Sequence, residues 1–461
     1  MNARVTGLVA SFYLAACLVL GGASAAGAFA NGVLQIAGLV LILLVLWRGP
    51  APALPHEARG PAWIWGLFLL VGLLTLIPLA PSIWTGLPYR DTVAEGYRLF
   101  GLPLPALPVT LSVHGTIASL LALIPPAAMF LLVLQLPAEQ RRMLLWTVLA
   151  VAGVSILLGA FQLMGGETSA LRLYQITSPH AAVGFFANQN HQATMLLCAL
   201  PFTGVLAARV ATRSGPRSKR SAGAVVSLAV ALFLTTGIAI SGSAAGYGLF
   251  LLSALATVLI YRRAVVGRLG WPWGIGLGVL LAALIVAGLA GPVSTQSLSE
   301  EVSEDPASRR VLAETTLDAV GDSFPVGTGL GTFSTVYRQY EEPNRVSRGY
   351  ANHAHNDYVE IALELGLAGI LLVLGFMLWW ARQSWRVWRT DFNGAALARS
   401  GSVIVGIVLL HSIVDYPIRT AAIAALFAAG CALLVPRAAP ARRREPAPDD
   451  GAAPLRHLEA D

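Results

Sequence analysis

The chain has 461 residues, of which 56% are hydrophobic and only 12% are charged, and its formal net charge is +7. Soluble globular domains carry about 25% charged residues, so this composition excludes them and indicates a polytopic membrane protein. The excess of basic residues does not require a nucleic-acid partner. In membrane proteins, Lys and Arg collect in cytoplasmic loops, where they meet anionic lipid headgroups.

Apolar runs long enough to cross about 30 Å of hydrocarbon recur along the chain and predict about twelve transmembrane helices. They lie at residues 8–25, 28–47, 61–80, 117–136, 143–164, 190–209, 223–241, 246–261, 271–291, 357–381, 400–414 and 419–436. Most of the basic residues fall in inside loops and tails if the N-terminus is cytoplasmic. The first run also has features of a cleavable secretory signal, ending in ASAAGAFA, but we interpret it as a membrane helix.

The three cysteines, Cys17, Cys198 and Cys431, all fall within predicted spans. This position predicts small buried apolar side chains and favours neither a disulfide framework nor a metal site.

These runs divide the chain into nine helices at 1–291, an outer loop at 292–356, three helices at 357–436 and a tail at 437–461. The loop is far longer than an ordinary connection, and such loops are usually functional or disordered. Helical spacing in PASRRVLAETTLDAVGD (306–322) predicts a helix lying on the membrane surface. The glycine-rich PVGTGLGTF (325–333) then predicts a sharp turn into a second short helix. The tail lacks periodicity, which is typical of disorder.

Arginines gather in this outer loop, ahead of the tenth predicted helix. A guanidinium group binds two phosphate oxygens at once and stays charged at any pH, so the cluster suits a phosphate or diphosphate. The alternative is that these arginines balance the acids of the same loop, since exposed ion pairs are common and weak. For the cluster as a whole we favour anion binding. It comprises Arg309, Arg310, Arg338, Arg345 and Arg348.

The segment YANHAHNDYVEIALELGLAG (350–369) places two histidines where this polar loop enters an apolar helix. Histidine titrates near neutral pH, so His353 or His355 could accept a proton from a sugar hydroxyl as a general base. A histidine at a helix end is more often a polar cap. Helix capping by Asn356 or Asp357 would explain two of the polar groups here, but intramembrane carboxylates such as Glu360 and Glu364 need a further reason.

Four motifs in order resemble the O-antigen ligase and polymerase superfamily of bacterial envelope glycosyltransferases. They are GFFANQNHQATMLLCALP (184–201), PVGTGLGTF (325–333), HAHNDYVEIALELGLAG (353–369) and HSIVDYPIR (411–419). The resemblance implies a GT-C-like, all-α polytopic fold with a long, partly helical periplasmic loop before the tenth helix. It further implies a multi-pass protein of the bacterial inner membrane, with its active site facing the periplasm.

The resemblance also implies the reaction. A glycan would move from undecaprenyl diphosphate to a lipid A core sugar in a ligase, or to a growing polysaccharide in a polymerase. Such enzymes use no cofactor, metal or nucleotide sugar, so the expected partners are the lipid-linked donor, the acceptor and membrane lipids.

Carried over by position, His355 matches the essential histidine of the family and would activate the acceptor hydroxyl. Arg309 or Arg310 matches the arginine that would hold the diphosphate. The chain departs from many relatives at Ala244, in SGSAAG, where they carry an arginine. Other arginines, among them Arg172, Arg345, Arg348 and Arg419, are candidates to replace that charge.

We therefore predict His355 as the catalytic base and a wider set of substrate-binding residues. His411, four residues before Asp415, is a weaker candidate, because polar residues at helix ends also pair with neighbouring helices. The substrate-binding set is Arg309, Arg310, Arg338, Arg345, Arg348, His353, Asn356, Tyr358, Arg172, Asn190 and His191.

Two other functions fit a chain of this class. A twelve-helix transporter or flippase of envelope precursors would place ionisable groups near the bilayer midplane, whereas the predicted spans here are almost free of charge at their centres. The missing arginine at Ala244 keeps open a third function, an inactive relative that acts as an assembly partner.

Overall fold

The computed structural model describes residues 2–24, 27–47, 54–212, 214, 216–265, 306–342 and 351–436, and for 306–310 the backbone alone. The first half of the described chain contains α1 (Ala3–Leu20), α2 (Ala28–Trp47), α3 (His56–Leu74), β1 (Pro78–Leu79), α4 (Pro81–Trp84), α5 (Asp91–Leu99), β2 (Leu107–Pro108), α6 (Val113–Leu121), α7 (Ile124–Gln135) and α8 (Arg142–Met164). The second half contains α9 (Gln189–Thr212), α10 (Arg217–Ile240), α11 (Ala244–Ala264), α14 (Pro306–Ser323), α15 (Phe333–Tyr340), α16 (Asp357–Arg389), α17 (Ala395–His411), the 3₁₀ turn η2 (Pro417–Arg419) and α18 (Ala421–Leu433).

The helices confirm an all-α polytopic membrane protein. Within the described residues, eight helices are long and apolar enough to cross a membrane. In the same part of the chain, α3, α17 and α18 match the three further predicted spans at 61–80, 400–414 and 419–436. The predicted span at 271–291 and the predicted disordered tail at 437–461 lie outside the described residues. The two strands are short and pair antiparallel, Pro78 with Pro108 and Leu79 with Leu107.

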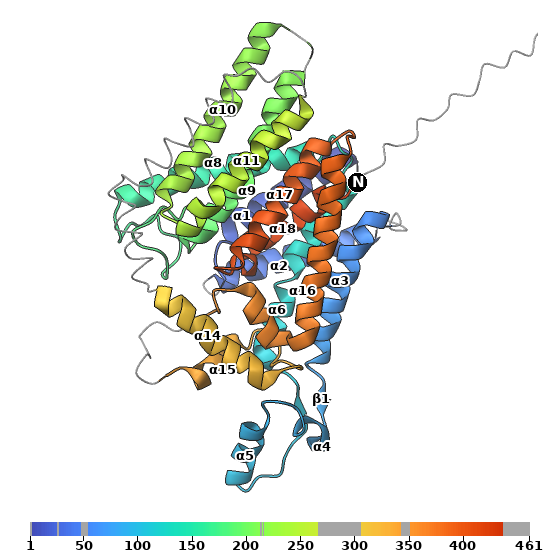
Figure 1. Ribbon diagram of the computed structural model, residues 1–461, viewed down its shortest axis with the longest axis vertical. Coiled ribbons are helices and arrows are strands. Elements are labelled where there is room, and N and C mark those ends of the chain that lie inside the picture. Colours follow the sequence, from blue (N-terminus) through green and yellow to red (C-terminus); the bar gives the residue numbers. More distant parts are fainter. Residues whose placement is uncertain are drawn as a thin grey trace, which may run out of the picture.

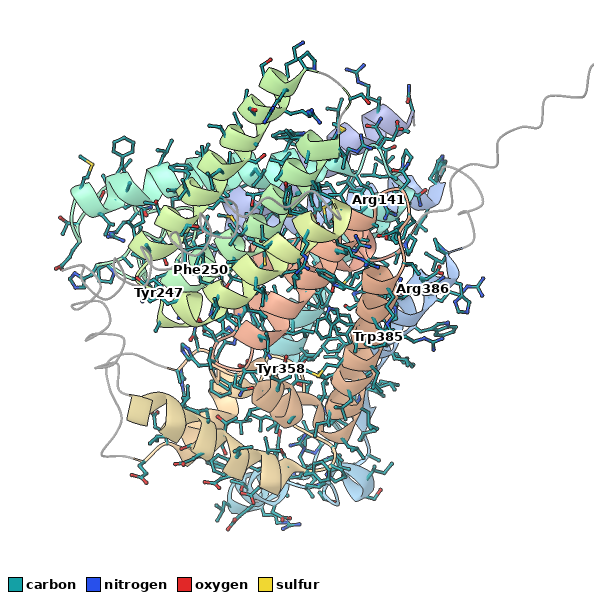
Figure 2. All side chains as sticks on the ribbon, turned by 45° about the horizontal axis from the view of Figure 1, so that its top comes forward. Arg141, Tyr247, Phe250, Tyr358, Trp385 and Arg386 are labelled. Carbon is teal, nitrogen blue, oxygen red and sulfur yellow. The ribbon has the colours of Figure 1, made fainter. Side chains whose placement is uncertain are left out.

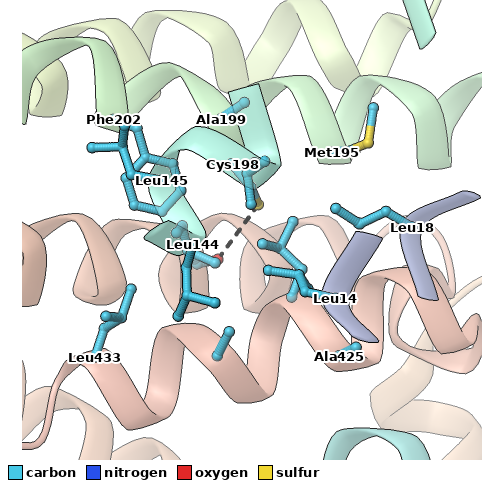
Figure 3. Packing of buried hydrophobic residues seen from close by; sticks show 14 of the residues in the cluster. Leu14, Leu18, Leu144, Leu145, Met195, Cys198, Ala199, Phe202, Ala425 and Leu433 are labelled. Carbon is cyan, nitrogen blue, oxygen red and sulfur yellow. Dashed lines mark hydrogen bonds between the residues drawn. The ribbon is translucent and has the colours of Figure 1, made fainter. Parts of the chain in front are cut away.

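Helix α9 lies at the centre of the bundle, where α8, α10, α11 and α17 all pack against it. Every residue from Asn190 to Leu206 is buried. Figure 3 shows the apolar packing of this helix, in which the Cys198 thiol points to the Ile404 carbonyl oxygen, 3.8 Å away. All three cysteines are buried, as the sequence predicts.

The rim of the bundle exposes apolar side chains, as expected where lipid replaces water. Helix α2 buries only Leu34 and Gly38, and its Phe29 and Trp47 are more than four-fifths exposed. Trp63 on α3 and Trp385 on α16 are also exposed. Exposed tryptophans beside arginines are typical of a membrane interface, and Figure 2 shows Trp385 next to Arg386 on α16.

The start of α3 and the end of α16 are joined by polar contacts. Arg386 pairs with Glu57 at 2.6 Å, and the Trp379 indole donates to the Glu57 carbonyl oxygen at 3.0 Å. The two helices therefore run side by side, in opposite directions, between the two ends of the bundle (Figure 1).

Helices α14 and α15 lie across the opposite end of the bundle, and β1, α4 and α5 project beyond that end (Figure 1). Their order confirms the predicted helix, glycine turn and second short helix. Tyr89 joins the two outer segments, since its hydroxyl donates to Gln339 at 2.8 Å and its ring stacks on Tyr340.

The glycine turn is built into a break in α16. Gly366 has φ 55° and ψ −139°, which interrupts the helix and frees carbonyl groups of the preceding turn. The amide of Thr328 donates to the Leu363 carbonyl oxygen at 3.0 Å, and that of Gly329 donates to the Glu364 carbonyl oxygen at 2.8 Å. The Pro325 carbonyl oxygen in turn accepts from the Leu367 amide at 2.9 Å. Two separate sequence motifs thus complete one another's backbone hydrogen bonds.

The break in α16 and its hydrogen bonds to the glycine turn predict that Gly366→Ala is strongly destabilising. Only glycine adopts this backbone conformation at low cost, which sets a penalty of about 1–3 kcal/mol from the backbone alone. An added Cβ would also overlap the Pro325 carbonyl oxygen. We expect a lower thermal unfolding temperature in detergent than for the wild-type protein.

Gly375→Ala is the matched control in the same helix, because a Cβ there meets only Ile64 Cδ1 at 4.0 Å. It should leave stability unchanged or raise it slightly, since Ala favours a helix interior. Equal unfolding temperatures for the two variants would contradict the role of the break.

Candidate active site

The two histidines of the HAHND motif lie just before α16, and Asn356 caps that helix by accepting from the Tyr358 and Val359 amides. His355 has φ 49°, a left-handed conformation that is uncommon for residues other than glycine and that recurs at functional sites. Its side chain is 25% exposed, and its Nδ1 lies 3.3 Å from Asp415 Oδ1. The ring therefore lies beside a carboxylate and is partly exposed.

Asp415 comes from the turn between α17 and α18 and is fully buried. Its Oδ1 accepts from the Tyr416 amide at 2.9 Å, and its Oδ2 lies 4.0 Å from His191 Nε2 on α9. Burial alone raises the pKa of a carboxyl group, but His355, His191 and His411 outweigh burial and hold the pKa of Asp415 well below its usual range. Asp415 is thus an anion placed between two imidazoles.

His353 makes a second pair of the same kind with Glu360, one turn into α16. Its Nδ1 lies 2.8 Å from Glu360 Oε1, and the amide of Ala354 donates to Glu360 Oε2 at 2.8 Å. The side chain of His353 stays 18% exposed, whereas Glu360 is buried. One carboxylate thus fixes both the backbone and the ring of the motif's first histidine.

The acids at the start of α16 surround a single guanidinium group, that of Arg419. Its Nε lies 3.1 Å from Asp357, and its two terminal nitrogens lie 3.0 Å from Glu360 and 3.4 Å from Glu364. These acids are three and four residues apart, so they share one helix face. Buried carboxylates are costly in a membrane protein, and the positive charge of Arg419 offsets that cost. We call Arg419, Asp357, Glu360 and Glu364 the Arg419 cluster.

The cluster extends to the neighbouring elements. Asp357 accepts from the Ser412 hydroxyl at 2.7 Å, and its amide donates to the Ser412 carbonyl oxygen at 2.9 Å. Glu364 accepts from the Gly331 amide at 2.7 Å, in the glycine turn. The start of α16, the turn after α17 and the glycine turn are therefore held together by one set of charges.

Tyr416 lies among three of the histidines. Its ring centroid is 4.4 Å from that of His353, 4.9 Å from that of His355 and 5.2 Å from that of His191. Its hydroxyl accepts from the Asn352 amide group at 3.3 Å. The structure thus brings the predicted residues His353, His355 and His191 together around one ring.

Other predicted residues have structural contacts in the described part of the chain. Asn356 is the helix cap, and the Tyr358 hydroxyl donates to the Leu409 carbonyl oxygen at 2.6 Å, which joins α16 to α17. Asn190 accepts from the Ser243 hydroxyl at 2.5 Å, which joins α9 to α11. Their assignment to substrate binding stays a prediction. A hydrogen bond of 2.7 Å joins His411 Nδ1 on α17 to Thr194 Oγ1 on α9.

The structure describes some of the predicted arginines in full and others only in part or not at all. Arg172 donates to the carbonyl oxygens of Ser178 and Ala181 at 2.9 and 3.3 Å, so its guanidinium group ties down its own loop. Arg338 is exposed on α15. Arg309 and Arg310 belong to the first turn of α14, where only the backbone is described, and Arg345 and Arg348 lie outside the described residues.

Sequence reasoning did not assign Asp415 or Tyr416 to the site, and considered Arg419 only as a replacement for the charge missing at Ala244. All three stand in HSIVDYPIR, the fourth motif of the resemblance, which is the signal that could have identified them. The part of the chain that the structure describes contains no group of three or more His, Cys, Asp or Glu side chains placed to hold a metal ion.

The geometry suits general base catalysis. A carboxylate beside Nδ1 favours the tautomer that carries its proton there, which leaves Nε2 free to accept a proton. His355 has this arrangement with Asp415 and is also accessible. His191 lies on the other side of Asp415 but is only 2% exposed, so it faces the protein interior.

One known family model matches the part of the chain that contains the HAHND motif and the glycine turn. Residues 228–374 match the family model described as O-antigen ligase, a stretch that includes the glycine turn, both histidines of the HAHND motif and the break in α16. No curated protein matches the chain. Residues 228–374 are therefore similar to the O-antigen ligase family, and this match supports the O-antigen ligase and polymerase superfamily.

Proposed function

We propose that this protein transfers a glycan from undecaprenyl diphosphate to an acceptor hydroxyl, with His355 as the general base. The family match supports glycan transfer of the ligase or polymerase type in general. The observation that supports His355 as the base is its Nδ1, 3.3 Å from the buried Asp415, on a ring that is 25% exposed against 18% for His353.

In the proposed step, the acceptor hydroxyl oxygen forms a bond to the anomeric carbon of the donor sugar. The bond between that carbon and the diphosphate oxygen breaks, and undecaprenyl diphosphate leaves with the electron pair. The hydroxyl proton passes to Nε2 of His355, and the positive charge that forms on the ring is stabilised by Asp415. No oxidant or reductant is needed.

Diphosphate is already a good leaving group, so positioning and charge stabilisation carry most of the barrier reduction. We assign this role to the loop arginines, chiefly Arg309 or Arg310 at the start of α14. Helix α14 packs against α16, the helix that begins at the HAHND motif, which supports a shared site. Arg419 is a poorer candidate, because three carboxylates already balance its charge.

The proposed location is the periplasmic side of the bacterial inner membrane. The site lies at the end of the bundle where α14 and α15 cross it, opposite the exposed Trp385 and Arg386 (Figures 1 and 2). An acceptor at this surface would be the core sugar of lipid A or the end of a growing polysaccharide.

His355→Ala should lower the transfer rate about 10²- to 10⁴-fold, the usual contribution of a general base. Asp415→Asn should also lower it, because the amide no longer stabilises the charged ring. The assay measures consumption of the lipid-linked glycan in membranes that contain equal amounts of each variant.

His114→Ala is the control, since His114 is an exposed histidine on α6. It should leave the rate unchanged. Full activity in His355→Ala membranes would remove His355 from the role of base.

Arg309→Ala with Arg310→Ala should raise the KM for the lipid-linked donor about 10- to 100-fold, as expected for the loss of one charge-assisted contact. Replacing both residues with Lys should restore part of the affinity, because the charge returns without the planar fork. Arg98→Ala, at an exposed position on α5, is the control. An unchanged KM in the double Ala variant would place the diphosphate elsewhere.

Deletion of the gene should separate ligation from polymerisation. Loss of long chains from the lipid A core, with intact lipid-linked polymer, indicates ligation. Loss of polymer with accumulation of single lipid-linked repeat units indicates polymerisation. The glycan profile is measured by electrophoresis and mass spectrometry, and an unchanged profile in the deletion strain would contradict both activities.

A further inference from the structure

The ring of Tyr416 occupies the space between the two histidine–carboxylate pairs. It contacts His353 in a tilted arrangement and His355 edge-on, with interplanar angles of 42° and 78°. Tyr416 is only 6% exposed, so a substrate meets little of its surface. Its contacts with the histidines therefore bear on the orientation of the histidine rings and not on direct substrate contact.

Tyr416 is itself held in place at several points. Its amide donates to Asp415, the partner of His355, and its hydroxyl accepts from Asn352, the residue before His353. Burial, followed by the negative charge of Asp415, raises the pKa of Tyr416, so the ring remains a neutral phenol. Pro417 follows, and Arg419 anchors the same turn to α16. The ring thus has a fixed position relative to both pairs.

In both partly exposed histidines of the HAHND motif, the same ring nitrogen lies nearest the carboxylate. Nδ1 of His353 faces Glu360, and Nδ1 of His355 faces Asp415. Rotation of either ring about its Cβ–Cγ bond would move the free nitrogen, and the face and edge of the Tyr416 ring oppose that rotation. A displacement of about 1 Å in a catalytic group can cost about 100-fold in rate.

We propose that Tyr416 is a positioning residue, whose ring sets the orientation of His355 and His353 so that both face one substrate. This inference rests on the proposed glycan transfer. It assigns the aromatic ring the main role and the hydroxyl a minor one, because the ring makes the contacts with both imidazoles.

The test compares Tyr416→Phe with Tyr416→Leu. Membranes containing each variant receive the lipid-linked glycan extracted from cells that lack the protein, and undecaprenyl diphosphate release is measured at several donor concentrations. Tyr416→Phe should keep kcat within about threefold of the wild type, since it retains the ring. Tyr416→Leu should lower kcat about 100-fold with an unchanged KM.

A purely structural role would instead reduce the amount of folded protein and would not produce a selective loss of kcat. Thermal unfolding in detergent therefore accompanies each measurement, and Tyr174→Leu, in the loop before α9, is the control that should keep full kcat. If Tyr416→Leu does not fold, Tyr416→Met, which fills more of the space without a planar ring, replaces it with the same expected loss.

Two results would overturn the inference, and they are distinguishable. Wild-type membranes that release no undecaprenyl diphosphate would refute the proposed function and this inference with it. Active wild-type membranes together with full kcat in the folded Leu or Met variant would refute the positioning role alone.

Discussion

The site depends on one largely buried guanidinium group, that of Arg419, in contact with three carboxylates of α16. A charged group leaves water only if other charges and hydrogen bonds replace its hydration, and loss of one partner from such a set costs about 3–5 kcal/mol. The four side chains therefore fix the turn between α17 and α18 against the first turns of α16. Asp415 lies in that turn, so the ionic contacts also determine where the partner of His355 stands.

The break in α16 connects this site to the outer helices. Gly366 ends the helical hydrogen bonding at the level of Glu364, and the glycine turn between α14 and α15 supplies the missing donors. Glu364 joins both systems, because its carboxylate accepts from the Gly331 amide and contacts Arg419. A short outer segment of α16 is thus fixed on one side by backbone hydrogen bonds and on the other by charge.

The sequence predicts the helices well, because long apolar runs and glycine turns are local signals. It also identifies His353 and His355 as candidates, because they stand together in one motif, and their roles stay predictions. It cannot predict that Asp415 meets His355, because α16 and α17 separate them and helix packing decides the contact. The same packing places Arg419 among three carboxylates, a contact that its place in the sequence does not indicate. Residues of a functional motif can also have structural contacts: Asn356 caps α16, and Tyr358 links α16 to α17.

The burial of the Arg419 cluster makes its contacts insensitive to the salt concentration of the medium. At 0.1 M ionic strength, mobile salt ions largely screen interactions between exposed charges that are more than about 10 Å apart, but they screen buried pairs much less. Arg419 is 16% exposed and its three partners are almost fully buried. The arrangement of His355 and Asp415 should therefore persist when the ionic strength of the surrounding medium rises or falls.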